Sequence, residues 1–179
     1  MAGGRGSRLG SVEKPLIRVC GRPMIDAVLA AAAAIGEPIL CTSPAAPATA
    51  DLYCGTARCV RGSGDYVGDL GTAIAAAGTP ALVLPADMPF LDRGVPELRA
   101  FVDMALRSDA AVVTLNVCRN GVCYQPGISL FNSPGGPWED IHILWRAAFL
   151  DVDDPRDLEE ARSLCGTTAE GNPADWTSA

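Results

Sequence analysis

The chain has 179 residues, of which 49% are hydrophobic and 20% are charged, which is ordinary for one globular domain with a buried core. Its formal net charge of −7 argues against a general nucleic-acid-binding protein, because phosphate backbones attract basic surfaces. The most apolar stretch, residues 24–36, is too short to span a bilayer, and the first residues do not form the apolar run of a signal peptide, so we expect a cytoplasmic protein without a membrane span.

The first predicted helix begins at Pro23 and ends at Gly36. Nearly every position outside its apolar stripe is alanine, so most of its surface must be covered. Burial against the chain's own sheet is the first expectation, and a homodimer is the alternative.

The rest of the chain alternates short apolar runs with helical patterns, which predicts an α/β fold with a mostly parallel central sheet flanked by helices. We expect one domain over residues 1–165 and a disordered tail over 166–179. Residues 43–50 are expected to form a loop. Strands are predicted at 38–43, 57–62, 79–90, 109–117, 123–131 and 149–152, and helices at 66–78, 95–108, 137–149 and 154–164.

Seven cysteines give an odd count without a Cys-x-x-Cys pair. Several lie in apolar runs, so we expect buried free thiols. A zinc site needs clustered ligands, and with His142 as the single histidine none is expected.

The opening "MAGGRGSRLG" is rich in glycine and arginine. It departs from the dinucleotide-binding pattern because Leu9 occupies the third glycine position, and it also lacks the lysine of a P-loop. What remains is a turn whose backbone N–H groups can face an anion beside Arg5, Arg8 and Lys14. A plain flexible loop is the alternative.

Three motifs point to a known family. The segments "MAGGRGSRLG…EKPL…GRPMI", "LVLPADMPFL" and "FLDVDDPRDLEEA" resemble, in order, the landmarks of nucleotidyltransferases with a GT-A-like, Rossmann-type fold. Such enzymes join an NTP to a phosphorylated acceptor and release pyrophosphate. Family members carry a short apolar strand before the glycine loop, in the middle of the sheet, and this sequence shows none there, so the first strand is expected to be missing.

Within this superfamily, "EKPLIRVCGRPMIDAV" and "QPGISLFNSP" resemble the archaeal-type GTP:adenosylcobinamide-phosphate guanylyltransferases of cobalamin biosynthesis. The resemblance implies transfer of GMP from GTP to a phosphorylated corrinoid, with Mg²⁺ as cofactor. The segment "DMPFL" fits the molybdenum-cofactor guanylyltransferases equally well, so a molybdopterin acceptor stays open. A GTP-binding remnant without catalysis is a third reading.

The resemblance assigns phosphate chemistry to the first motif. Arg8, and with it Arg5, would neutralise the leaving β- and γ-phosphates, and Lys14 would lie at the α-phosphate, aimed by the extended backbone that Pro15 favours. A solvated surface lysine is the alternative for Lys14. The triphosphate would be held by the backbone of Ala2, Gly3, Gly4, Arg5, Gly6 and Ser7.

The second and third motifs supply carboxylates. By resemblance, Asp87 would bind Mg²⁺, and the alternative is a turn or cap residue before Pro89. Asp151 and Asp153 occupy the positions of two family asparagines, so they would complete the metal site, Asp153 above all, or replace polar turn contacts.

Guanine would be read at the ends of the second and third strands. That places Thr42, Ser43, Gly64 and Asp65 near the base, where the Asp65 carboxylate can accept hydrogen bonds from N1–H and N2–H₂. An ordinary glycine-rich turn is the alternative for residues 62–65. Gly127 resembles the glycine at which the acceptor approaches the nucleotide, and a β-bulge is its alternative.

Overall fold

The structure is a computed structural model that describes residues 1–2, 9, 13–166 and 176–177. Its helices are α1 (Met24–Ile35), α2 (Pro47–Tyr53), α3 (Tyr66–Ala77), α4 (Val95–Ala105) and α5 (Pro155–Ser163), with short 3-10 turns at Lys14–Leu16, Leu91–Gly94 and Ala147–Phe149. Its strands are β1 (Arg18–Val19), β2 (Arg22–Pro23), β3 (Ile39–Thr42), β4 (Arg58–Arg61), β5 (Ala81–Val83), β6 (Val112–Arg119), β7 (Val122–Tyr124), β8 (Ser129–Phe131), β9 (Trp138–Leu144) and β10 (Trp176–Thr177).

The predicted α/β architecture is confirmed, with a mixed sheet. The larger sheet has the order β10–β9–β6–β8–β5, with β7 paired to β6, and β3 and β4 form a separate parallel pair. Within the larger sheet β6 and β9 are parallel, while β8 runs antiparallel to both β5 and β6. The expectation of a mostly parallel sheet therefore holds only for these two parallel pairs, because the β6–β7 hairpin reverses the chain ahead of β8.

The helices with local start and stop signals lie where they are predicted. Helix α1 begins directly after Pro23 and ends at Gly36, and its buried side chains face the core rather than solvent. Helix α5 begins with a capping box, in which the Asp154 carboxylate accepts from the N–H of Asp157 and the Asp157 carboxylate accepts from the N–H of Asp154. These start and stop signals are residue types at fixed positions within or next to the helix, so the helix ends can be predicted from the sequence alone.

The predicted helix at 137–149 is wrong. Residues 138–144 form β9, a seven-residue strand parallel to β6, in which Ile141 and Ile143 are buried and His142 between them is more exposed. This alternation has the period of a strand, and pairing with β6 satisfies its backbone. A 3-10 turn at Ala147–Phe149 follows.

Three shorter segments also differ from expectation. The predicted loop at 43–50 contains the start of α2 at Pro47. The predicted strand at 123–131 is divided into β7 and β8, and no strand is assigned to 149–152. Of the tail, Trp176–Thr177 pairs with β9 as β10, and residues 167–175 and 178–179 lie outside the described residues.

The expectation of free thiols is wrong for six of the seven cysteines. Disulfides join Cys20 to Cys165, Cys54 to Cys59 and Cys118 to Cys123, while Cys41 is free and buried. The last two pairs are five residues apart, a spacing that brings thiols together only because a turn reverses the chain between them.

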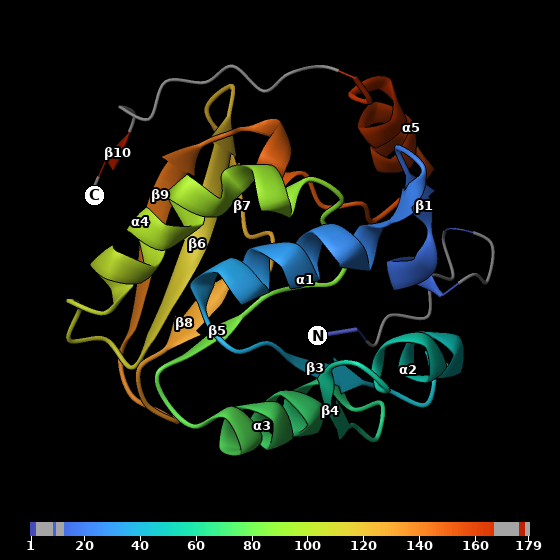
Figure 1. Cartoon of the computed structure of the whole chain (residues 1–179). Helices are drawn as coiled ribbons and strands as arrows, with labels where there is room; N and C mark the ends of the chain where they lie inside the picture. The colour runs from blue at the N-terminus through green and yellow to red at the C-terminus, as the bar shows by residue number, and fades with distance from the viewer. Residues whose placement is uncertain (3–8, 10–12, 167–175, 178–179) are drawn as a thin grey trace.

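One face of the larger sheet carries the main core. Helices α1 and α4 lie side by side on it (Figure 1), so α1 is covered by its own sheet and by α4. Helices α2 and α3 pack beside the β3–β4 pair.

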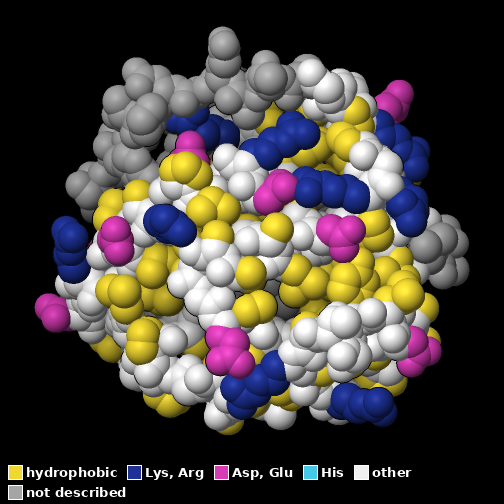
Figure 2. All heavy atoms as spheres, in the orientation of Figure 1, with side chains coloured by type: hydrophobic (Ala, Val, Ile, Leu, Met, Phe, Trp, Pro, Cys, Tyr) yellow, Lys and Arg dark blue, Asp and Glu magenta, His cyan; other side chains and the backbone are white. Residues whose placement is uncertain are grey.

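Among the residues that the structure describes, no helix combines the length and apolarity of a membrane span. Figure 2 shows hydrophobic side chains exposed across the middle of the face viewed there.

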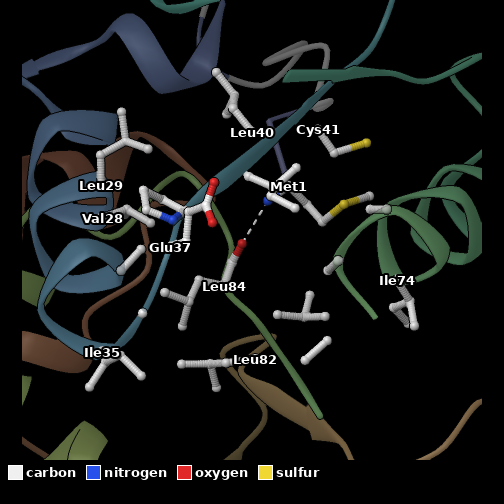
Figure 3. A pocket seen from close by; sticks show the side chains of 18 of the residues that line it. Met1, Val28, Leu29, Ile35, Glu37, Leu40, Cys41, Ile74, Leu82 and Leu84 are labelled. Atoms are coloured by element: carbon white, nitrogen blue, oxygen red, sulfur yellow. Dashed lines mark hydrogen bonds between the residues drawn. The ribbon is translucent and has the colours of Figure 1, made fainter. Parts of the chain in front are cut away.

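A groove separates β3 from β5. It holds a cavity of about 460 Å³ between the two strands, into which the first residues of the described chain extend. The Met1 ammonium donates to the Leu84 carbonyl (2.7 Å; Figure 3), and Ala2 forms a parallel bridge with Thr42 while its N–H donates to Cys41. Burial lowers the pKa of the Met1 α-amino group. The apolar lining includes Val28, Leu29, Ile35, Leu40, Ile74 and Leu82.

Gly94 lies at a close contact between the turn before α4 and the turn at Ala147–Phe149. A Cβ atom at Gly94 would lie 2.8 Å from the Cβ of Ala148, although the backbone of Gly94 (φ −100°) is open to any residue. We expect Gly94→Ala to lower the free energy of unfolding by about 1–3 kcal/mol, the usual cost of overpacking. The measurement is urea-induced unfolding.

The matched control is Gly71→Ala, on α3, where an added Cβ meets nothing within 4 Å. This variant should raise the free energy of unfolding by about 0.5–1 kcal/mol, because alanine favours the helix over glycine. Equal effects of the two variants would contradict the close contact at Gly94.

Candidate active site

Three of the predicted catalytic and metal-binding residues meet at one point. The Lys14 Nζ lies 2.5 Å from Oδ2 of Asp87 and 2.5 Å from Oδ1 of Asp153. Lys14 is the only lysine in the sequence, and its side chain is 12% exposed. The arrangement argues against the alternative of a solvated surface lysine.

Backbone contacts bring these residues together. Lys14 opens the turn Lys14–Leu16, Asp87 follows the end of β5, and Asp153 directly precedes the cap of α5. The N–H of Val152 donates to the Asp87 carbonyl at 3.1 Å, which joins the last two segments.

The site holds more carboxylates than ammonium groups. Burial lowers the pKa of Lys14, but Asp87 and Asp153 raise it more, so its pKa lies above the ordinary value and Lys14 is charged. Burial, together with the charges of Asp153, Asp87 and Asp157, raises the pKa of Asp151 to about 6. Among the described residues, negative charge therefore exceeds positive charge at this position, which favours a further cation.

The residues fit a divalent cation bound by oxygen. Oδ1 of Asp87 is buried and has no hydrogen-bond partner among the described residues, although Oδ2 is paired with Lys14. A buried carboxylate oxygen without a donor is costly unless a ligand or ion completes it. Carboxylates are the ligands that Mg²⁺ takes together with substrate phosphates.

A cavity of about 350 Å³ opens beside Asp87. Three of the predicted nucleotide-binding residues line it together with Asp87: Ser43, Gly64 and Gly127. The larger groove between β3 and β5 is mainly apolar and contains none of the clustered carboxylates, so we place the candidate site in the smaller cavity. Its further lining residues are Met1, Tyr66, Asp69, Val83 and Pro85.

Other predicted nucleotide-binding residues lie beside the cavity, line it or fall outside the described residues. Thr42 and Ala2 are buried beside the cavity and pair with each other through the backbone. Gly127 has φ +84°, a conformation that favours glycine. Gly3, Gly4, Arg5, Gly6, Ser7 and Arg8 lie outside the described residues.

Asp65 and Asp69 shape the turn that was predicted to read guanine. Oδ2 of Asp65 caps α3 by accepting from the N–H of Gly68 at 2.8 Å, so this oxygen is already engaged. Asp69, which the sequence analysis missed, accepts from the N–H groups of Ser63 and Gly64 at 2.5 and 3.0 Å. The hydrogen bond from Ser63, followed by that from Gly64, holds the pKa of Asp69 below its usual value despite burial.

Glu13 is a second residue that sequence reasoning missed. Its carboxylate accepts from the N–H groups of Ala48 and Thr49, each at 2.7 Å, and from the Thr49 hydroxyl at 2.6 Å. It therefore caps α2 from a distant segment and fixes the residue next to Lys14. The one available signal is Ala46, which precedes the helix and cannot cap it through a side chain.

Comparisons with known proteins identify the sequences that this chain resembles. Residues 1–137 match the model of the MobA-like NTP transferase domain. An adenosylcobinamide-phosphate guanylyltransferase of Methanocaldococcus jannaschii is 35% identical over 98 residues, which are 49% of this chain and 50% of the relative. A molybdenum cofactor guanylyltransferase of Shewanella amazonensis is 33% identical over 136 residues, 73% of this chain and 65% of the relative. The chain thus spans about half to two thirds of the length of these relatives.

Solved structures support the fold class. The molybdopterin-guanine dinucleotide biosynthesis protein A of Archaeoglobus fulgidus aligns with a TM-score of 0.63 at 16% identity, over 92% of this chain and 95% of that one. The 4-diphosphocytidyl-2C-methyl-D-erythritol synthase of Anaerococcus prevotii aligns with a TM-score of 0.64 at 13% identity, over 86% and 90%. These likenesses confirm the Rossmann-like fold expected from the sequence.

The Glu13 cap makes stability depend on pH. Burial raises the pKa of Glu13, but the hydrogen bonds from Thr49 and Ala48 outweigh burial and lower the pKa below its model-peptide value of 4.5. The stabilisation is therefore complete above pH 4.5 and is lost as the pH falls through the lower folded-state pKa. We expect Glu13→Gln to cost about 1 kcal/mol at neutral pH, the scale of a helix cap, and less in acid.

Denaturant unfolding of the wild type and Glu13→Gln at neutral and acidic pH measures this difference. The control is Glu159→Gln, which changes an exposed glutamate on α5. A loss that is the same at both pH values would mean that the charge of Glu13 does not cap α2.

Proposed function

Because this chain belongs to the family of MobA-like NTP transferase domains, we propose that it transfers GMP from GTP to adenosylcobinamide phosphate and releases pyrophosphate. The observation that carries this proposal is the meeting of Lys14, Asp87 and Asp153 beside a cavity lined by Ser43 and Gly64. A cationic group, candidate metal ligands and a cavity for a base are the parts that nucleotidyl transfer needs.

The reaction exchanges one phosphate bond for another. An oxygen of the acceptor phosphate attacks the α-phosphorus of GTP and forms the new P–O bond, while the bond from the α-phosphorus to the bridging oxygen breaks. The electron pair stays on pyrophosphate. The attacking phosphate is already ionised, so the protein must position and neutralise charge more than it must remove a proton.

Lys14 would contact the α-phosphate. Asp87 and Asp153 keep its ammonium charged and hold it beside the cavity that Asp87 lines, since both carboxylates accept hydrogen bonds from Nζ. Arg8, together with Arg5, would neutralise the departing phosphates, and backbone N–H groups of residues 2–7 would hold the triphosphate. These last roles rest on the sequence resemblance.

Asp87 and Asp153 would hold Mg²⁺. When bound, Mg²⁺ neutralises phosphate oxygens and orients the leaving pyrophosphate. The unpartnered Oδ1 of Asp87 supports a cation here, because it is a buried carboxylate oxygen that the described residues leave without a partner.

The base would lie against the turn at residues 62–65. Asp69 holds the N–H groups of Ser63 and Gly64, so the turn has a fixed shape beside Ser43. Tyr66, 60% exposed at the same cavity, offers an aromatic ring against which a base can stack. Asp65 would read the guanine edge through the oxygen that does not cap α3.

Molybdopterin is the second candidate acceptor. It is favoured by the similarity to the Shewanella amazonensis relative, which extends over 73% of this chain, against 49% for the cobinamide relative. The two proposals share GTP, Mg²⁺ and the same site, and differ only in the molecule that attacks.

An acceptor trial decides between them. The measurement is pyrophosphate release from GTP with Mg²⁺, in the presence of adenosylcobinamide phosphate, molybdopterin or neither. We expect release that requires adenosylcobinamide phosphate. Release that requires molybdopterin instead would replace the acceptor, and GTP binding without release from any acceptor would contradict the enzyme proposal.

Lys14→Ala tests the transition-state contact. It should lower kcat by about 100-fold or more, the scale of losing one charge contact in a transition state. The control is Arg107→Ala, which removes an exposed positive charge after α4 and should leave kcat unchanged. Bound GTP should also protect Lys14 from an amine-reactive label, because the phosphate would cover its ammonium group. Peptide mass spectrometry measures this labelling at a single lysine side chain, since Lys14 is the only lysine in the sequence. An unchanged kcat in Lys14→Ala would exclude this role.

A further inference from the structure

A second cluster of reactive side chains lies at the β6–β7 hairpin, outside the proposed catalytic residues. It contains Cys118 and Cys123, which face each other across the hairpin, and His142 of β9. One ligand atom from each of the three lies within 4.8 Å of the other two. In the structure the two sulfur atoms are joined, and the Nδ1 of His142 lies 3.7 Å from the Cys118 Sγ.

The sequence builds this cluster through two strand pairings. Asn120 and Gly121 form a two-residue turn with φ values of 53° and 79°, which sets Cys118 opposite Cys123. The parallel pairing of β6 with β9 then places His142 opposite Asn116. Asn116 precedes Cys118 by two residues on β6, so the two residues are neighbours on the same face of the strand. The three side chains therefore project from paired strands rather than from a loose loop.

The face that carries the cluster is polar where its opposite is apolar. Val113, Leu115 and Val117 of β6 are buried in the main core, so Asn116 and Cys118 lie on the other face. Asn116 is only 6% exposed, and its Nδ2 has no hydrogen-bond partner among the described residues. An unpaired amide donor on this face suits thiolates, whose charge N–H groups stabilise.

We propose that Cys118, Cys123 and His142 form a binding site for Zn²⁺, or a divalent transition metal of similar chemistry, once the disulfide between the two cysteines is reduced. The oxidised hairpin has no thiolate to offer, so binding is controlled by the redox state. The site is independent of the proposed guanylyl transfer.

The chemistry balances with a dithiol as the reductant. The dithiol transfers two electrons and two protons, the S–S bond opens to two thiols, and the reductant becomes a cyclic disulfide. Zn²⁺ then binds two thiolates and the neutral imidazole and releases the two thiol protons. Cys123 is exposed, so the reductant can reach the bond.

Sulfur and imidazole ligands select the metal class. Two thiolates and one imidazole favour Zn²⁺ over Mg²⁺ or Ca²⁺, which take oxygen ligands. Bond lengths of about 2.3 Å to sulfur and 2.0 Å to nitrogen place neighbouring ligand atoms of a tetrahedral site about 3.5–3.8 Å apart. The distance of 3.7 Å between the Cys118 Sγ and the His142 Nδ1 lies within this range. Water would complete the coordination.

A disulfide that only stabilises the hairpin does not explain why a histidine lies beside it. The pair Cys54 and Cys59 has the same sequence separation of five residues and forms a disulfide without any histidine, since His142 is the only one in the chain. The histidine beside Cys118 is thus not a requirement of the disulfide. The Cys54–Cys59 pair also supplies a matched control.

The experiment is a Co²⁺ titration of the full chain, oxidised and after reduction, followed by displacement with Zn²⁺. The reductant is a phosphine, which yields the same two thiols and becomes a phosphine oxide by taking oxygen from water, so that no added thiol competes for Co²⁺. We expect sulfur-to-cobalt charge-transfer absorption at one Co²⁺ per chain only after reduction. Cys118→Ser/Cys123→Ser should abolish the band. His142→Gln should weaken Co²⁺ binding by at least about tenfold, because losing a direct ligand should cost no less than losing a residue that only hydrogen-bonds to one. Cys54→Ser/Cys59→Ser should retain the band.

Three results would overturn the proposal. They are a reduced wild type without the charge-transfer band, a band that survives in Cys118→Ser/Cys123→Ser, or wild-type affinity in His142→Gln. Co²⁺ bound at the carboxylates near Asp87 would not give a sulfur band, so the two sites remain distinguishable. Circular dichroism of each variant shows that it is folded.

Discussion

The double ion pair of Lys14 joins three segments that are far apart in the sequence. Its ammonium donates to both carboxylates, and one of these, Asp87, has a side chain that is only 20% exposed. A partly buried charge without its partner would be costly, so the turn at residues 14–16, the end of β5 and the start of α5 must be placed together. Glu13 then fixes the same turn to α2, which makes the position of Lys14 a property of the whole fold.

The parts of the fold that could be predicted are those with local signals. Helix α1 lies between Pro23 and Gly36, and α5 begins with Asp154 and Asp157 in reciprocal hydrogen bonds. Strand β9 has no local signal beyond the short alternation of Ile141, His142 and Ile143, which is too brief to exclude a helix. Its identity depends on pairing with β6, more than twenty residues earlier. The cysteine pairs share this dependence on tertiary contacts.

The candidate site was predictable as far as its motifs extend. The resemblance predicts roles for Lys14, Asp87 and Asp153, and the structure brings these residues to one point, which resemblance alone does not show. Sequence reasoning misses Glu13 and Asp69 because each accepts from backbone N–H groups, which every residue type except proline supplies. Side chains that serve distant or turn amides leave no pattern of spacing in a sequence.

The separation of the β3–β4 pair from the larger sheet has a consequence for how the molecule is held together. The β3–β4 pair and the larger sheet share no strand pairing among the described residues, and the cavity of the candidate site is lined from both sides, by Ser43 and Gly64 on one and Asp87 and Gly127 on the other. A nucleotide seated there would touch both halves and resist their separation. A bound substrate would then stabilise the packing of the β3–β4 pair against the larger sheet, and part of its binding energy would raise the free energy of unfolding of the protein.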